Sequence, residues 1–142
     1  MSINFGIQGG AYSLVDTECY CCDGTMVYAG GPCVHCKNGI TQVAEPEVPD
    51  VQFSNANARD FLVALGETPE CYGIWESDRL LVIRDRLVLL STAGVDLLVK
   101  DLTRDGNMIH CGRDEDYVRR RATQLLALVR SAIEKKLPVS WG

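Results

Sequence analysis

The chain has 142 residues, 46% of them hydrophobic, and a formal net charge of −5. This length suits one ordinary domain or a small module joined to a small domain, and the apolar content excludes a disordered tail. The longest apolar runs are far shorter than the roughly 20 residues that a membrane-spanning helix needs. The first residues, MSINFGIQGGAYS, have neither the basic start nor the apolar run of an export signal, so we expect a cytoplasmic protein.

The charge is unevenly distributed along the chain. Residues 1–50 contain six acidic residues and a single basic one, Lys37, whereas residues 51–142 contain thirteen of each. Because nucleic-acid binding depends mainly on basic groups that contact phosphates, the first third of the chain has the wrong sign for it. Seven cysteines in a cytoplasmic chain indicate metal binding or thiol chemistry more than disulfides.

The first eighteen residues are rich in glycine and predict irregular structure, with a short strand at residues 11–15. They lead into CYCCDGTMVYAGGPCVHC, residues 19–36, which holds five of the seven cysteines. Two C-x-x-C pairs stand ten residues apart in it. Two residues between thiolates allow a tight turn to direct both sulfurs at one ion, and two such turns close a tetrahedral shell. The spacing therefore predicts one structural Zn²⁺, bound by Cys19, Cys22, Cys33 and Cys36.

The residues around the cysteine pairs support this interpretation. Gly24 and Gly39 stand just past the two pairs, where the turns need a positive φ, and residues 25–31 are typical of a strand followed by a turn. A complete thiolate shell leaves no open position for a catalytic water. Cys21 and His35 are each adjacent to a predicted ligand, and we expect them to face away from the metal.

Two alternatives for the cysteines stay open. C-x-x-C also serves thioredoxin-like redox enzymes, although those need a strand-to-helix junction that the turn-rich sequence does not indicate. Cys71, His110 and Cys111 are the remaining residues that could bind a metal. They lack the spacing of the first group, and packing positions are the simpler interpretation for them.

The segment AEPEVPDVQ, residues 44–52, contains two prolines and three acids and predicts an extended linker. A short helix is expected over residues 54–66, with Ser54 or Asn55 as its N-cap and Gly66 as its stop. A second helix is expected over residues 78–91 after Ser77. Its apolar residues recur at helical spacing, and they are Leu80, Ile83, Leu87 and Leu90.

The segment 95–112 favours a β-hairpin because Asp105-Gly106 is a strong turn signal with β-prone flanks. A helix over residues 93–102 is the alternative. The clearest element is an amphipathic helix over residues 114–136, with acids at its start and lysines at its end, as the helix dipole prefers. Its apolar stripe consists of Val118, Ala122, Leu125, Val129 and Ala132.

These elements predict an α+β fold. We expect a small N-terminal zinc ribbon at residues 1–45, a linker at 46–52, and a mainly helical domain with one β-hairpin at 53–142.

The cysteine module resembles a zinc ribbon, or one half of the cysteine-rich repeat of DnaJ-type chaperones, whose pattern is C-x-x-C-x-G. The likeness covers residues 19–39. The four cysteines and Gly24 match the pattern, whereas the glycine of the second pair, Gly39, comes three residues after Cys36 instead of two. The resemblance implies a structural zinc ion.

The segments NANARDFLVALG, residues 55–66, and 112–142, which close with VSWG, resemble small uncharacterised bacterial and prophage-associated proteins. The resemblance implies a prophage or mobile-element origin and carries no activity. It also implies a shared structural or binding surface that consists of Asn57, Arg59, Tyr117, Arg121, Trp141 and Gly142.

We found no Ser-His-Asp set, phosphate-binding loop, dinucleotide fingerprint or HExxH motif. The hypothesis that the sequence favours is a non-enzymatic zinc-binding adaptor or regulator that acts through protein–protein contacts, while an enzymatic role stays open. The candidate partner surface consists of Arg59, Arg119, Arg120 and Trp141.

Three of these four residues also have a structural interpretation. Trp141 would then be held against the long helix, and Arg119 and Arg120 would pair with Glu115 and Asp116, four residues earlier.

Two other functions remain open. One is a nucleic-acid-associated regulator that binds through Arg119, Arg120 and Arg130, and the other is a redox-responsive thiol or zinc protein. The sequence does not indicate an oligomeric state.

Overall fold

A computed structural model of the chain describes residues 2–92, 103–105, 108–110 and 114–142. They contain both helices and strands, which confirms the predicted α+β class. The chain divides into two compact units. The first, here the sheet–helix unit, comprises Met1–Gly10 and Val48–Gly142, and the second, here the ribbon unit, is Ala11–Glu47.

The sheet–helix unit is built on a four-stranded antiparallel sheet in the order β6-β1-β10-β7. Its strands are β1 (Ser2–Ile7), β6 (Val51–Ser54), β7 (Gly73–Trp75) and β10 (Val139–Trp141). Side chains alternate across the sheet, so Ile3 and Phe5 of β1 are buried while Ser2 and Asn4 are exposed.

This sheet alters the predicted domain boundaries. The sequence assigned residues 1–45 to the ribbon and 46–52 to a linker, whereas β1 pairs with β6 and β10 and thereby joins the first ten residues to the second half of the chain. The description of residues 53–142 as mainly helical omitted β7, β10 and the end of β6. The expected linker itself contains the end of β5 (Ile40–Pro46) and the start of β6.

Helix α1 (Asn55–Ala64) begins where it was predicted. The Ser54 side chain accepts a hydrogen bond from the backbone N–H of Asn57, as an N-cap does. The chain leaves the helix at Gly66, the residue after the C-cap Leu65, and the φ of Gly66 is +71°. The N–H of Glu67 donates to the carbonyl of Leu62. This is the Schellman arrangement that glycine favours.

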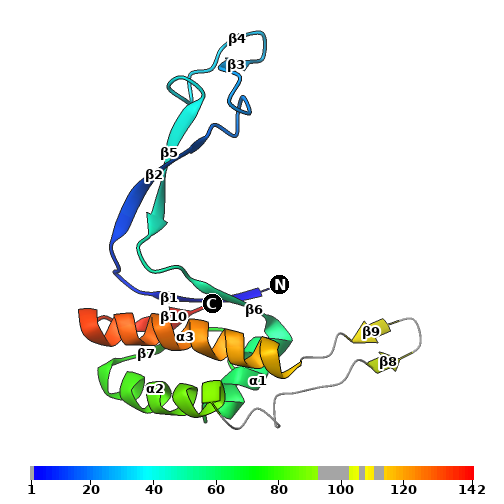
Figure 1. Ribbon diagram of the computed structural model, residues 1–142, viewed down its shortest axis with the longest axis vertical. Helices are drawn as coiled ribbons and strands as arrows, with labels where there is room; N and C mark the ends of the chain where they lie inside the picture. The colour runs from blue at the N-terminus through cyan, green and yellow to red at the C-terminus, as the bar shows by residue number, and fades with distance from the viewer. Residues whose placement is uncertain (1, 93–102, 106–107, 111–113) are drawn as a thin grey trace. The chain divides into compact units, whose positions relative to one another are not determined.

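Helices α2 (Ser77–Thr92) and α3 (Glu115–Lys135) lie side by side in the sheet–helix unit (Figure 1). The predicted apolar stripes of both helices are buried, which confirms them. The Asp114 side chain caps α3 by accepting from the N–H of Tyr117, and Lys136 ends the helix in the left-handed region.

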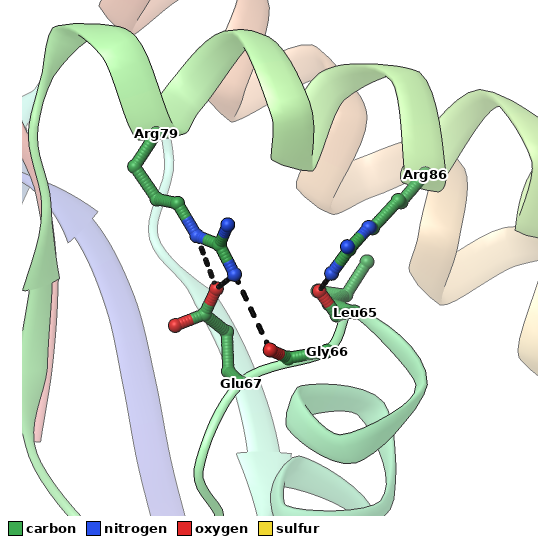
Figure 2. Close-up of polar contacts among 5 residues, drawn as sticks. All are labelled: Leu65, Gly66, Glu67, Arg79 and Arg86. Carbon is green, nitrogen blue, oxygen red and sulfur yellow. Dashed lines mark hydrogen bonds and ion pairs between the residues drawn. The ribbon is translucent and has the colours of Figure 1, made fainter.

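Two arginines of α2 hold the C-terminal end of α1 (Figure 2). The Arg86 guanidinium donates to the carbonyl of Leu65, and Arg79 donates to the carbonyl of Gly66 and pairs with the Glu67 carboxylate. The last carbonyls of a helix lack partners within it. The two arginines of α2 therefore donate hydrogen bonds to backbone carbonyls at the C-terminal end of α1.

An aromatic cluster lies in the core of the same unit. The Phe5 ring stacks on Trp75 and Trp141 at centroid distances of 5.5 and 5.8 Å, and the two indoles are 4.8 Å apart. The Trp141 Nε1–H donates to the carbonyl of Glu70. Both tryptophans of the chain belong to this cluster.

Strands β8 (Thr103–Asp105) and β9 (Met108–His110) pair antiparallel, which confirms the predicted hairpin. The alternative helix over residues 93–102 lies outside the described residues. Among the residues that the structure describes, no helix has the length and apolar character to cross a membrane.

The ribbon unit contains two short antiparallel ladders. Strand β2 (Tyr12–Glu18) pairs with β5 along seven residue pairs, and β3 (Val27–Tyr28) pairs with β4 (Gly31–Pro32). Nearly all side chains of β2 and β5 are exposed. Within this unit the buried residues are Cys19, Cys22 and Gly39, so it lacks an apolar core.

Candidate metal centre

The four predicted ligands come together at one end of the ribbon unit. The sulfurs of Cys19, Cys22, Cys33 and Cys36 all lie within 4.8 Å of one another. The Sγ of Cys19 is 3.8 Å from that of Cys33, and the Sγ of Cys22 is 3.6 Å from that of Cys36. A tetrahedron with metal–sulfur bonds of about 2.3 Å has sulfur–sulfur edges of about 3.8 Å. The sulfur positions fit a metal ion bound by four thiolates.

Local backbone geometry explains why the two C-x-x-C turns face each other. Asp23 and Gly24 follow the first pair with φ of +46° and +71°, and Asn38 and Gly39 follow the second with φ of +55° and +80°. Positive φ turns the chain back sharply after each pair, and glycine and asparagine adopt it at low cost. The predicted need for positive φ at Gly24 and Gly39 is confirmed.

A tight hairpin joins the two turns. Ala29 and Gly30 connect β3 to β4 with φ of +52° and +80°, the pattern of a two-residue hairpin turn. The strand and turn predicted at residues 25–31 are therefore present. The N–H of Cys33 donates to the carbonyl of Met26 at 2.8 Å, and the N–H of Cys19 donates to the carbonyl of Gly39 at 2.8 Å. The second bond ties the start of the first turn to the end of the second.

The environment shifts the pKa values of three of these thiols, one downward and two upward. Burial raises the pKa of Cys19, but hydrogen bonds from the backbone N–H groups of Cys21 and Cys22 outweigh it and lower that pKa to about 7. Burial raises the pKa of Cys36 to about 12, and hydrogen bonds to neighbouring sulfurs act in the same direction. Burial also raises the pKa of Cys22. The amides of the first turn thus favour a thiolate at Cys19.

The other residues that could bind a metal lie outside this group. Cys21 is half-buried, and His35 is exposed with its ring edge toward Tyr28. Cys71 is exposed, and its sulfur is 3.9 Å from Nη2 of Arg59. The second site considered for Cys71, His110 and Cys111 cannot be built, because Cys111 lies outside the described residues.

The arginines of the candidate partner surface differ in their contacts. Arg119 pairs with Glu115 as predicted, and the Arg120 guanidinium lies 5.9 Å from the ring centroid of Tyr117. Arg59 and Arg130 are exposed.

Trp141 does not belong to an exposed surface. It is buried in β10, where its ring lies against Phe5 and Trp75. The sequence lacked the signal for this, because β10 is only three residues long.

Part of the surface implied by the second resemblance is a contact cluster. The amide of Asn57 donates to the hydroxyl of Tyr117 at 2.8 Å, and the guanidinium of Arg121 lies 5.7 Å from the centroid of that ring. Gly142 pairs through its backbone with Asn4. These contacts give Asn57, Tyr117 and Arg121 a structural role within the sheet–helix unit.

A hollow beside the second cysteine turn was missed by the sequence. Its volume is about 630 Å³, and its walls include Asp16, Ile40 and Gln42 of the β2–β5 ribbon and Val34, Cys36 and Lys37 of the turn. The register of β2 against β5, which brings Asp16 opposite Gln42, creates it. Residues 12–16, Tyr-Ser-Leu-Val-Asp, carry no local signal for it, because it forms between the ladder and a turn distant in sequence.

No protein-family model, curated protein or solved structure matches this chain.

Proposed function

We propose that the protein is a non-enzymatic adaptor or regulator whose ribbon unit is a zinc ribbon that makes protein–protein contacts. The observation that carries the proposal is the composition of that unit's interior. Its buried side chains are those of two cysteines, Cys19 and Cys22, from the four-sulfur group. A unit of 37 residues without an apolar core needs another source of folding free energy. Metal binding supplies on the order of 10 kcal/mol in small zinc modules.

Zinc is the ion that the ligand set favours. Four thiolates in a tetrahedral arrangement suit Zn²⁺ or an iron–sulfur centre, and the C-x-x-C turns with backbone N–H groups directed at sulfur are typical of structural zinc. When bound, Zn²⁺ would be held by Cys19, Cys22, Cys33 and Cys36 and would serve as a structural cross-link. A closed four-thiolate shell offers no position for an activated water, which favours binding over catalysis.

The surface of the ribbon unit supports contact with another protein. Its exposed apolar side chains include Tyr12, Leu14 and Val34, with exposed fractions of 65%, 68% and 85%. Clusters of exposed apolar residues mark interaction sites more often than scattered ones do. The unit holds five acidic residues and one lysine, which makes nucleic acid a poor partner. The pairing of Arg119 with Glu115 weakens the alternative of phosphate contact on α3.

Two measurements test the proposal. Elemental analysis of the purified chain should find one zinc per molecule and no stoichiometric iron. An affinity capture from source-cell lysate, half of it treated with nuclease, should then enrich specific proteins that survive the nuclease. The double variant Cys33→Ser/Cys36→Ser should lose them. Recovery of nucleic acid, with proteins lost on nuclease treatment, would favour the nucleic-acid regulator instead.

Mild oxidation distinguishes a redox role from a structural one. If the four thiols act as a switch, mild oxidation should release zinc and a reductant should restore its binding without aggregation. For the structural role that we propose, oxidation should unfold the ribbon unit and abolish the captured interactions.

A further inference from the structure

We propose that the ribbon unit binds an extended protein segment in which apolar residues are followed by lysine or arginine. The binding surface is one face of the β2–β5 ribbon together with the adjoining hollow. This inference rests on the proposed function and defines the chemistry of its partner.

The register of the ribbon sorts its residues into two faces. Residues directly opposite each other in an antiparallel pair share a face, and every second pair points the same way. One face, here the Leu14 face, carries four alternate pairs, which are Tyr12 with Pro46, Leu14 with Ala44, Asp16 with Gln42, and Glu18 with Ile40. Along β2 the apolar residues Tyr12 and Leu14 precede the carboxylates Asp16 and Glu18, and Ile40 lies opposite Glu18.

The Leu14 face is the more exposed of the two. Tyr12 and Leu14 have exposed fractions of 65% and 68%, whereas Val15 and Val43, which oppose each other on the other face, have 38% and 42%. A two-stranded ribbon without a packed face is marginally stable in water. Covering the large side chains of this face would therefore stabilise the ribbon as well as bind the partner.

The hollow extends this face toward the metal centre. Asp16, Ile40 and Gln42 belong to both, while Val34, Cys36 and Lys37 from the second cysteine turn form the facing wall. A segment that follows the face from Leu14 therefore meets a carboxylate and then the hollow. Because Cys36 is a predicted ligand, one wall of the hollow depends on the metal site.

Charge identifies the partner. Neither Asp16 nor Glu18 forms an ion pair with any residue that the structure describes, and Asp16 accepts a hydrogen bond only from Gln42. The single base of the ribbon unit is Lys37. A second copy of this chain that docked through the same face would place carboxylates against carboxylates, which is destabilising. A segment with basic residues is attracted and steered instead.

The spacing of side chains along β2 indicates the order of residues in the partner segment. Residues two apart on a strand are separated by about 7 Å, which is the interval between Leu14 and Asp16 and between Asp16 and Glu18. An extended segment with alternate apolar and then alternate basic residues matches this order. Successive side chains on one side of it would meet Tyr12, Leu14, Asp16 and Glu18 in turn.

The test is an NMR titration of the ¹⁵N-labelled, zinc-loaded full chain with two peptides. The first is Ser-Leu-Ser-Leu-Ser-Lys-Ser-Lys-Ser, and the second has glutamate in place of both lysines. We expect the lysine peptide to shift the amides of Leu14, Asp16 and Ile40 and to bind about tenfold more tightly than its twin, since two weak surface ion pairs become repulsions.

Three variants locate the effect. Leu14→Ser should weaken the lysine peptide at least threefold, whereas Leu89→Ser, a change at a residue that is 65% exposed on α2, should not. Asp16→Lys should reduce or reverse the preference between the peptides. Retention of zinc by each variant shows that its ribbon unit is folded.

Equal binding of the two peptides, absence of binding, or dimerisation of the chain through the Leu14 face would overturn the inference. These results leave the proposed function intact if capture of proteins from lysate still requires the metal cysteines. Conversely, if the Cys33→Ser/Cys36→Ser variant captures the same proteins as the unmodified chain, the proposed function is rejected, whatever the peptides do.

Discussion

Gly39 and Gly24 pack backbone to backbone across the metal centre. A β-carbon at Gly39 would overlap the carbonyl oxygen of Gly24, and Gly39 also has a φ of +80°. Both features forbid a side chain at this position. The contact sets how closely the two cysteine turns approach, and therefore how closely their sulfurs converge.

We expect Gly39→Ala to weaken zinc binding at least tenfold, because the added methyl group pushes the turns apart and strains the backbone. Competition with a chromophoric chelator measures the affinity. Gly31→Ala is the matched control, since nothing lies within 4 Å of a β-carbon there, and it should bind zinc normally. An unchanged affinity for Gly39→Ala would show that the turns can separate without loss of the site.

Zinc binding should depend steeply on pH. The raised pKa values of Cys22 and Cys36 keep these thiols protonated at pH 7.5, and binding requires thiolates. Binding must therefore release at least two protons, so the apparent affinity should rise about 100-fold per pH unit and fall on acidification. Below pH 7 the proton of Cys19, whose pKa is about 7, adds to the release.

Isothermal titration calorimetry in phosphate and in Tris measures the number of protons directly. The two buffers differ in ionisation enthalpy, so the observed enthalpies should differ by at least twice that difference at pH 7.5. A release of fewer than one proton would contradict the assigned acidities.

Removal of the metal should affect one unit only. The apolar core lies entirely within the sheet–helix unit, and both tryptophans belong to it. We therefore expect a strong chelator to leave the tryptophan emission and its thermal transition within about 2 °C of the untreated chain, while amide exchange in residues 11–47 becomes fast. Loss of the tryptophan transition would show that the sheet–helix unit depends on the metal.

The arginines of Figure 2 predict a difference between neighbours on α2. Arg86→Ala should lower the free energy of unfolding by about 1–3 kcal/mol, because it leaves the carbonyl of Leu65 without its donor. Arg84→Ala should change it by less than about 0.5 kcal/mol, since Arg84 pairs with its exposed neighbour Asp85. Urea denaturation followed by tryptophan emission compares them. Equal effects would mean that the contact to α1 adds no stability.

Local features of the chain were predictable because their causes are local. Ser54 and Gly66 bound α1 through hydrogen bonds within a few residues, and the apolar stripes of α2 and α3 follow from helical spacing. The cysteine group was predictable for the same reason. Two residues between ligands leave few backbone conformations that direct both sulfurs at one point.

The sheet of the first unit could not be predicted in this way. Strand β10 is three residues long and pairs with β1 at the opposite end of the chain, and strands so short carry little periodic signal. The position of Trp141 and the place of β1 in the sheet follow from such long-range pairing.

The sequence by itself determined three helices, a hairpin near residue 105 and four cysteines able to share one metal ion, because propensity, capping and ligand spacing act over short stretches. Only the tertiary structure decided which distant strands pair, that Gly39 rests on Gly24, and that Asp16 lies beside both Leu14 and the second cysteine turn. Those relationships depend on strand register and on close approach between segments far apart in the chain, which no local pattern encodes.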